Sequence, residues 1–281
     1  ATAKLGIATP DDLAGRMGEL AAIGPSVSAL TAGTVPGEGH AARQASGPAI
    51  RLLGPCEVVV GGAVVDCPAG LLGQALKRVA LAGRLPIEEL MEELWPGAAP
   101  GAGRQRLRTL LTRLRQVVGP LLMRDGDWIR LAPEVEVDTL RFEELAGAAE
   151  AAAAARDPQA GELAGRALKL YRGELLPTDR HLDFTSGRRE RLRRRYLSMV
   201  TIAVDHVAPG QVDRAVRLLE AAITEDPHEE TLYIRAAALL ATADRAGEAA
   251  SFLRRARAAL AELGVEPSSE AVELDRSLTR R

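Results

Sequence analysis

A repeat with a period of 34 residues restricts the fold of this chain more than any other feature of its sequence. Residues 214–222 reappear in similar form as residues 248–256, and this period is that of paired tetratricopeptide helices. Alanines at matching points allow paired helices to approach closely, and Pro227 ends one helix just before the next begins. The ranges 139–156 and 159–172 fit the same helical scheme, followed by a longer insertion at 173–187.

Strand signals occur only before this helical region. The β-prone runs 56–60 and 63–67 flank Gly61-Gly62 and predict a hairpin. Helical patterns follow at 70–82, 86–95 and 103–118, and the runs 121–124 and 127–131 then flank an Asp125-Gly126 turn. Strands, three helices and a closing hairpin are the elements of a winged helix.

The expected fold is therefore mainly α with a small β component. We expect a winged helix-turn-helix domain at 49–134, followed by an all-α tetratricopeptide-like repeat domain at 135–281. Residues 1–48 are expected to hold a short helix at 10–23 and a flexible linker.

Composition excludes several classes of protein. No apolar run reaches the length of about 18 residues that a transmembrane helix needs, and no secretory signal is visible. Two cysteines cannot form a disulfide scaffold, and the four histidines lack metal-ligand spacing. There is no phosphate-binding loop and no recurring set of nucleophile, base and orienting group. We therefore expect a cytoplasmic protein with no enzymatic activity, cofactor, metal or membrane contact.

The range 104–118 is the most informative segment for function, because it holds five arginines and no acidic residue. At 100° per residue, Leu107, Leu111, Leu114 and Val118 form one apolar stripe that should pack on the core. The other side of the helix then presents polar residues that suit a DNA groove, which are Gln105, Arg106, Arg108, Thr109, Thr112, Arg113 and Gln116.

These residue types can read bases. Arginine can donate two hydrogen bonds to guanine, glutamine can pair with adenine, and a threonine methyl can contact the thymine methyl. Arg124 at the hairpin tip and Arg130 on its return strand would form a basic wing for the adjacent minor groove. The alternative is that these arginines are an ordinary solvated helix face, because the whole chain is rich in arginine.

Four sequence segments resemble the Streptomyces antibiotic regulatory protein family, a family of transcription activators. They are Leu53-Gly54-Pro55, Leu94-Trp95-Pro96, the Thr-Arg-Leu-Arg core of residues 112–115 and Asp138-Thr139-Leu140-Arg141-Phe142. Residues 167–173 and 262–267 resemble the bacterial transcriptional activator domain of the same family, so the resemblance covers about 50–281.

The resemblance implies an OmpR-type winged helix that binds direct repeats in promoter DNA as a head-to-tail dimer and recruits RNA polymerase holoenzyme. It also makes Arg113 a base-reading candidate. Two departures, Gln116 where a basic residue is common and a helix after Pro68 without a basic start, predict modest affinity for phosphates. The rival interpretation is a tetratricopeptide-like interaction scaffold or sensor whose winged helix no longer binds DNA.

Two further features have interpretations of their own. The arginine-rich run 188–195 is expected to pair with acidic residues of the repeat domain, with a second nucleic-acid contact as the alternative. If Gly61-Gly62 is a two-residue turn, Cys56 lies opposite Cys67. Two reduced thiols are the favoured state there in a reducing cytoplasm, and a redox switch is the alternative.

Overall fold

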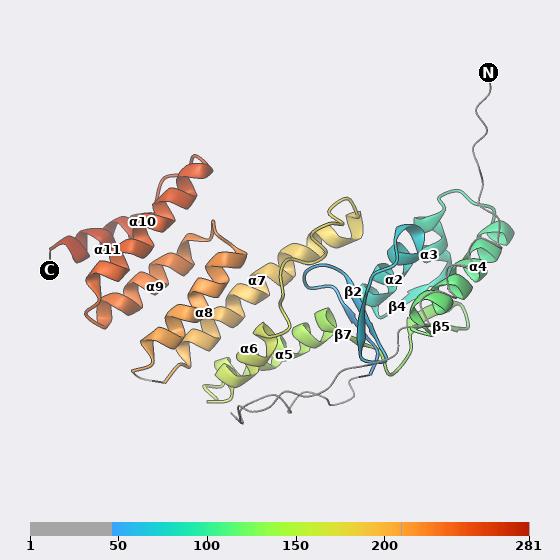
Figure 1. Ribbon diagram of the computed structural model, residues 1–281, viewed down its shortest axis with the longest axis horizontal. Coiled ribbons are helices and arrows are strands. Elements are labelled where there is room, and N and C mark those ends of the chain that lie inside the picture. Colours follow the sequence, from blue (N-terminus) through green and yellow to red (C-terminus); the bar gives the residue numbers. More distant parts are fainter. Residues whose placement is uncertain (1–46, 209, 281) are drawn as a thin grey trace, which may run out of the picture. The chain divides into compact units, whose positions relative to one another are not determined.

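The computed structural model describes residues 47–208 and 210–280 (Figure 1). The helix expected at 10–23 and most of the linker after it lie outside the described residues. In the part of the chain that is described, no helix is long and apolar enough to cross a membrane.

A four-stranded sheet opens the described chain. Its strands are β1 (Ala49–Arg51), β2 (Glu57–Val60), β3 (Ala63–Asp66) and β7 (Glu136–Val137), in the order β3-β2-β1-β7. Strands β2 and β3 pair in the expected register, with Val58 opposite Val65. Both residues of the turn, Gly61 and Gly62, have positive φ angles, which glycine adopts without steric cost.

The other elements of the winged-helix region follow strand β3. They are α2 (Gly70–Ala82), β4 (Arg84–Pro86), α3 (Ile87–Leu94), α4 (Pro100–Val118), β5 (Leu122–Asp125) and β6 (Trp128–Leu131). Strands β4, β6 and β5 form a second sheet in that order. Leu76, Leu90, Leu114 and Ile129 are fully buried, so the helices and this sheet share one core.

The closing hairpin differs from the expected one by a single position. Asp125 pairs with Trp128, so the turn is formed by Gly126 and Asp127 rather than by Asp125-Gly126. Gly126 has a φ of 59° and supplies the left-handed conformation that the first position of such a turn requires.

The remaining helices of the described residues belong to the repeat region. They are α5 (Asp138–Ala154), α6 (Ala160–Leu168), α7 (Asp183–Asp205), α8 (Val212–Glu225), α9 (Glu230–Thr242), α10 (Ala246–Glu262) and α11 (Ser269–Thr279). The repeat is confirmed by burial, because the buried side chains of α8 recur in α10 at the same offset. These pairs are Ala215 with Ala249, Leu219 with Leu253, and Ala222 with Ala256.

Helix α6 ends at Leu168, four residues earlier than expected. Leu170 and Tyr171 donate backbone hydrogen bonds to carbonyls only three residues back, which closes the helix with tight turns. The ring of Tyr171 then stacks on Tyr196 of α7, with 4.1 Å between the ring centroids. The insertion therefore covers 169–182, and it leads the chain back to the winged helix.

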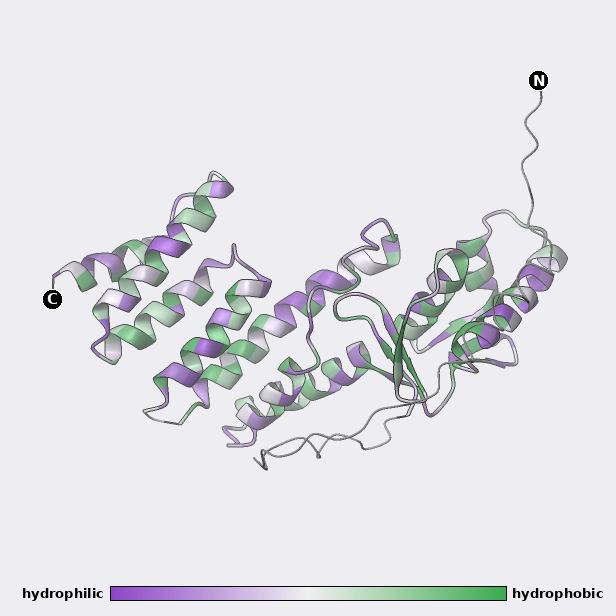
Figure 2. Cartoon of the chain, viewed as in Figure 1, coloured by the Kyte–Doolittle hydropathy of each residue, from purple (hydrophilic) through white to green (hydrophobic). Residues whose placement is uncertain are grey.

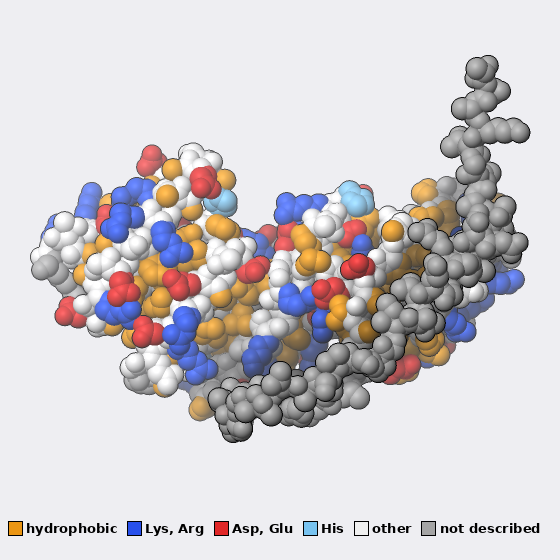
Figure 3. Space-filling model, in the orientation of Figure 1, with side chains coloured by type: hydrophobic (Ala, Val, Ile, Leu, Met, Phe, Trp, Pro, Cys, Tyr) orange, Lys and Arg blue, Asp and Glu red, His pale blue; other side chains and the backbone are white. Residues whose placement is uncertain are grey.

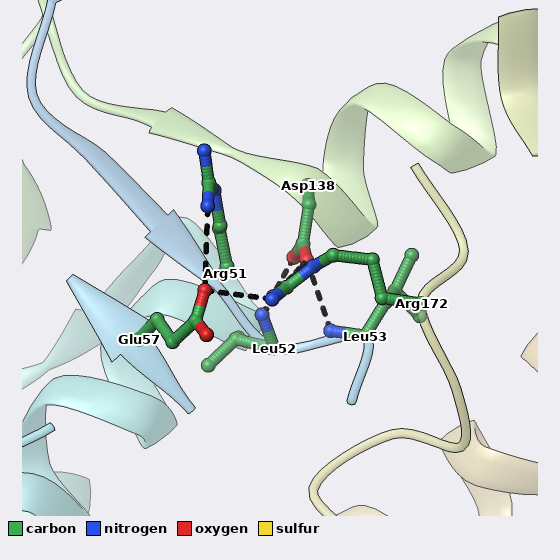
Figure 4. A network of polar contacts seen from close by, with 6 residues as sticks. All are labelled: Arg51, Leu52, Leu53, Glu57, Asp138 and Arg172. Carbon is green, nitrogen blue, oxygen red and sulfur yellow. Dashed lines mark hydrogen bonds and ion pairs between the residues drawn. The ribbon is translucent and has the colours of Figure 1, made fainter. Parts of the chain in front are cut away.

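Polar contacts join the winged helix to the repeat region at the start of α5 (Figure 4). Asp138 accepts hydrogen bonds from the backbone N–H groups of Leu52 and Leu53, and Arg172 binds Glu57 at 2.7 Å. Further along the junction, Lys77 of α2 binds Asp179 at 2.7 Å, and both side chains are largely buried.

The arginine-rich run pairs with acidic side chains, as expected. Arg188 binds Glu143, Arg195 binds Glu150, and Arg193 binds both Asp226 and Glu229. Arg188 also donates to the carbonyl oxygen of Leu81 at the end of α2. The run therefore holds the repeat helices together and contributes to the junction with the winged helix.

Candidate nucleic-acid interface

Helix α4 is fixed by one buried side. Gly103 lies so close to α3 that a Cβ atom there would be 3.1 Å from the Sδ atom of Met91. Below it, Leu107, Leu110, Leu114 and Val118 are buried. The predicted stripe was wrong at one position, because Leu110 is buried whereas Leu111 is only partly buried.

The reason lies in what flanks the helix. On one side Leu110 lines a hollow together with Leu72 and Trp95, two residues that pack against the core. On the other side Leu111 faces the hollow between α4 and the β5–β6 hairpin, where solvent enters. A rotation of 100° per residue places Leu110 and Leu111 on either side of the direction set by Leu107 and Leu114. Only the neighbouring elements distinguish the two leucines.

Every polar residue predicted on the outer side of α4 is exposed, which brings seven of the nine candidates onto one helix. These are Gln105, Arg106, Arg108, Thr109, Thr112, Arg113 and Gln116. Figure 2 shows hydrophilic and hydrophobic residues interleaved along the ribbon of α4, as expected for an amphipathic helix.

Both threonines on this side turn their hydroxyl groups back onto the helix. Thr109 donates to the carbonyl oxygen of Gln105 at 3.1 Å, and Thr112 donates to that of Arg108 at 3.0 Å. With its hydroxyl hydrogen used internally, each side chain offers its methyl group for apolar contact. This arrangement suits a thymine methyl in a major groove.

The arginines of α4 differ from most arginines of the repeat region. Within the described residues, Arg106, Arg108, Arg113 and Arg115 have no carboxylate within ion-pair distance, and Arg104 has only a contact of 3.6 Å with Glu88. Figure 3 shows basic and acidic side chains mixed over the repeat helices. Apart from Arg104, the arginines of α4 therefore present positive charge that no acidic residue of the described structure pairs with.

Two hollows flank the crest of α4. One, of about 300 Å³, lies toward α2 and is lined by Gln105, Arg106, Thr109 and Arg113 together with apolar residues. The other, of about 220 Å³, lies toward the hairpin and is lined by Arg104, Arg108 and Arg124, among others. The basic residues thus stand on both flanks of the helix, with Thr112 and Gln116 between them.

The two candidates on the hairpin are separated by the sheet. Arg124 pairs with Ile129 across the strands and lies on the side that faces α4, where its Nε donates to the carbonyl oxygen of Gly126 at 2.8 Å. Arg130 lies on the opposite side of the sheet and binds Asp125 at 3.1 Å. The hairpin therefore adds one basic residue to the face of α4, and the second points away from it.

A basic residue that the sequence analysis missed lies beside Arg130. Arg84 of β4 is opposite Arg130 in the register, and its guanidinium lies 4.0 Å from the ring centroid of Trp128. Trp128 is itself 38% exposed. The alternation of Arg84, Leu85 and Pro86 was the only available signal, and three residues are too few to predict a strand.

Among the described residues, no group of three His, Cys, Asp or Glu side chains could hold a metal ion. What the interface offers is hydrogen-bond donors, methyl groups and unpaired positive charge. These are the properties that recognise a nucleic-acid duplex.

Comparison with known proteins then identifies the helical region. Residues 137–279 match the family model described as the bacterial transcriptional activator domain, over half of the chain. The chain belongs to the bacterial transcriptional activator domain family. The matched range runs from the end of β7 to the last residue of α11.

Curated relatives agree with this membership. The transcriptional regulatory protein EmbR of Mycobacterium tuberculosis is 27% identical over 244 residues, which cover 82% of this chain and 63% of EmbR. The regulatory protein AfsR of Streptomyces griseus is 30% identical over 208 residues, which cover 72% of this chain and 21% of AfsR. The chain thus spans less than two thirds of the length of either relative, and the resemblance to the Streptomyces antibiotic regulatory proteins is confirmed.

A solved structure supports the fold. The structure titled Mycobacterium tuberculosis EmbR in complex with low affinity phosphopeptide matches with a TM-score of 0.61 and 24% identity, covering 83% of this chain and 65% of that chain. This member of the bacterial transcriptional activator domain family therefore has the predicted fold class. It consists of a winged helix followed by tetratricopeptide-like helices.

Proposed function

We propose that this chain is a sequence-specific DNA-binding transcription regulator, with α4 in the major groove and the β5–β6 hairpin beside it. The winged helix at 49–134 would bind the duplex, and the helical region at 135–281 would serve assembly or sensing. One observation carries the proposal: the exposed side of α4 bears arginines that have no acidic partner in the described structure. Transcription regulators among the relatives support it.

Each candidate has a role in this proposal. The residues on the crest of α4 and on the flank toward α2 would contact base edges. They are Arg113, Gln105, Thr109, Thr112 and Gln116. Arg106, Arg108 and Arg124 would contact phosphates on either side, and Arg130 could join them once its contact with Asp125 is released.

The test is binding to DNA across a salt series. Sites selected from a random duplex pool by the full chain would be labelled, and their affinity measured by fluorescence anisotropy beside that of the unselected pool. We expect enrichment of one motif and an affinity that falls steeply with salt, by a slope of about −0.9 for each phosphate neutralised. No enrichment and no retention at low salt would support the rival interpretation, an interaction scaffold or sensor.

The finer parts of the proposal concern assembly. We propose that the protein is an activator, that two copies bind direct repeats head-to-tail, and that the complex recruits RNA polymerase holoenzyme. Two selected motifs in the same orientation, spaced by a whole number of helical turns, are the expected result. Transcription from a promoter with those sites should then rise on addition of the protein to purified RNA polymerase.

A further inference from the structure

The two cysteines of the chain lie opposite each other at the open end of the β2–β3 hairpin. The paired register continues one step beyond the strands, because the backbone N–H of Cys67 donates to the carbonyl oxygen of Cys56 at 3.4 Å. Such hydrogen-bonded cross-strand pairs have Cα atoms about 5.5 Å apart, which lies within the range of about 4.4–6.8 Å found for disulfides. The backbone therefore already holds both cysteines at bridging distance.

The surroundings of the pair favour reaction over inert burial. Both residues are half-buried rather than enclosed in the core. A hydrogen bond from the Cys56 thiol and the charge of Lys77 lower the pKa of Cys67, while the same hydrogen bond and burial raise that of Cys56. The sulfur of Cys67 is thus the better nucleophile, and Cys56 stays protonated to higher pH.

The first turn of α2 holds Cys67 in this place. Gly73 packs so tightly that a Cβ atom there would lie 1.9 Å from the carbonyl oxygen of Pro68 and 3.6 Å from the Sγ atom of Cys67. Because this close packing leaves little space around the segment from Cys67 to Gly73, we expect Cys67 to keep its position opposite Cys56.

We propose that Cys56 and Cys67 form a reversible oxidation site that reacts with hydroperoxides to give an intramolecular disulfide. The Cys67 thiolate attacks one peroxide oxygen, the O–O bond breaks, and Cys67 becomes a sulfenic acid as hydroxide or alkoxide leaves and takes up a proton from solvent. The Cys56 sulfur then attacks the Cys67 sulfur, its proton leaves with the displaced hydroxyl group as water, and the S–S bond forms. Two thiols lose two electrons and two protons, and with hydrogen peroxide the reduced product is two molecules of water.

The site also lies at the junction between the two domains. Lys77, whose charge lowers the pKa of both thiols, is the residue that binds Asp179 of the repeat region at 2.7 Å. Formation of the disulfide would remove the negative charge that a Cys67 thiolate places near Lys77, and Asp179 would remain the anionic partner of this lysine. We therefore expect oxidation of the pair to change the electrostatic environment of the contact that joins the domains.

The full chain provides its own test, because it contains two cysteines in all. The reduced protein would be titrated with hydrogen peroxide, blocked with a maleimide and digested by cleavage after Glu57, which separates the two cysteines. We expect the count of free thiols to fall from two to none, and the two peptides to stay joined until a reductant is added. The product should migrate as a single chain on a non-reducing gel.

Single substitutions serve as matched controls. In Cys56→Ser the other cysteine should stop at a sulfenic acid that dimedone traps. In Cys67→Ser no disulfide can form within the chain, and the remaining thiol, whose pKa burial still raises, should be lost more slowly than in the unaltered chain. Two thiols that stay free, separate oxidation to sulfinic acids, or a disulfide between two chains would each overturn the proposal.

Discussion

The carboxylate of Asp138 accepts the backbone N–H of Leu52 through both of its oxygens, at 2.8 and 2.9 Å. A third hydrogen bond comes from the N–H of Leu53 at 2.9 Å, and Arg172 lies 3.8 Å away. Asp138 is only 9% exposed, so no solvent could replace it as the acceptor for these two amides. One side chain at the start of α5 thus satisfies the backbone where β1 ends (Figure 4).

Replacing Asp138 with alanine should destabilise the protein. The substitution leaves two buried N–H groups without an acceptor, which costs about 1–3 kcal/mol in the free energy of unfolding. Urea denaturation followed by circular dichroism measures the loss. Glu144→Ala, an exposed position of the same helix, is the control and should change the free energy by no more than about 0.5 kcal/mol. Equal losses for the two variants would contradict the assigned role.

Replacing Arg113 with alanine should weaken binding to the selected DNA site by about 1–3 kcal/mol and relax base preference at one position. The reason is the loss of two hydrogen bonds to one base edge. Anisotropy titrations on the selected site and on the unselected pool measure both effects. Arg254→Ala, an exposed arginine of α10, should change neither affinity. An equal loss on both kinds of DNA would show that Arg113 contacts phosphate instead.

The two arginines of the hairpin should respond differently to substitution. Arg124 faces α4, so Arg124→Ala should weaken binding to all sequences and reduce the salt slope by about 1. Arg130 lies on the other side of the sheet and already binds Asp125, so Arg130→Ala should have the smaller effect. Salt titrations of the two variants, run in parallel, decide the matter. A larger loss for Arg130→Ala would mean that the outer side of the sheet contacts the DNA.

Glycine-to-alanine substitutions should have opposite effects at two helical positions. In Gly73→Ala the new methyl group would meet the carbonyl oxygen of Pro68 at 1.9 Å, so the backbone must shift, at a cost of about 1–3 kcal/mol. In Gly165→Ala the methyl group meets nothing within 4 Å, and stability should rise by about 0.5–1 kcal/mol. Thermal denaturation of the two variants gives the signs, and a neutral Gly73→Ala would show that α2 has more room than described.

Alkylation of the cysteines should depend on pH in two different ways. The pKa of Cys67 is lowered by the Cys56 hydrogen bond and by Lys77, with Asp179 opposing them, so its reactive thiolate persists to lower pH. The pKa of Cys56 is raised, so Cys56 should react only at higher pH. Iodoacetamide labelling over a pH series, read by peptide mass, gives both profiles. In Cys56→Ala the profile of Cys67 should move to higher pH, and superimposable profiles in the unaltered chain would contradict this assignment.

Local patterns were enough to predict much of the fold. Gly61-Gly62 fixes the register of its hairpin, because two residues of positive φ allow only one way for the flanking strands to pair. The offset between residues 214–222 and 248–256 likewise predicts the repeat, since equivalent helices must bury equivalent alanines. The exposed side of α4 follows from the 100° rotation per residue.

Other features depend on contacts between distant residues. Strand β7 has two residues and pairs in parallel with β1, far earlier in the chain, and so short a strand carries no periodic signal. The contact of Lys77 with Asp179 and that of Asp138 with Leu52 join segments whose proximity no local pattern reveals. The separation of Arg124 from Arg130 was predictable, because side chains alternate along a strand and neither register of this hairpin puts both on one side.

Strand β7 ends at Val137 and α5 begins at Asp138, with no residue between them. Because no flexible residue separates β7 from α5, the carboxy-terminal helices cannot rotate freely while the winged helix is bound to a duplex. In the proposed complex of two copies, the angle between the two binding sites around the DNA axis would thus set the direction in which each repeat region extends. Inserting about 5 bp between the sites, which is half a turn of the double helix, would place the two repeat regions on opposite faces of the DNA.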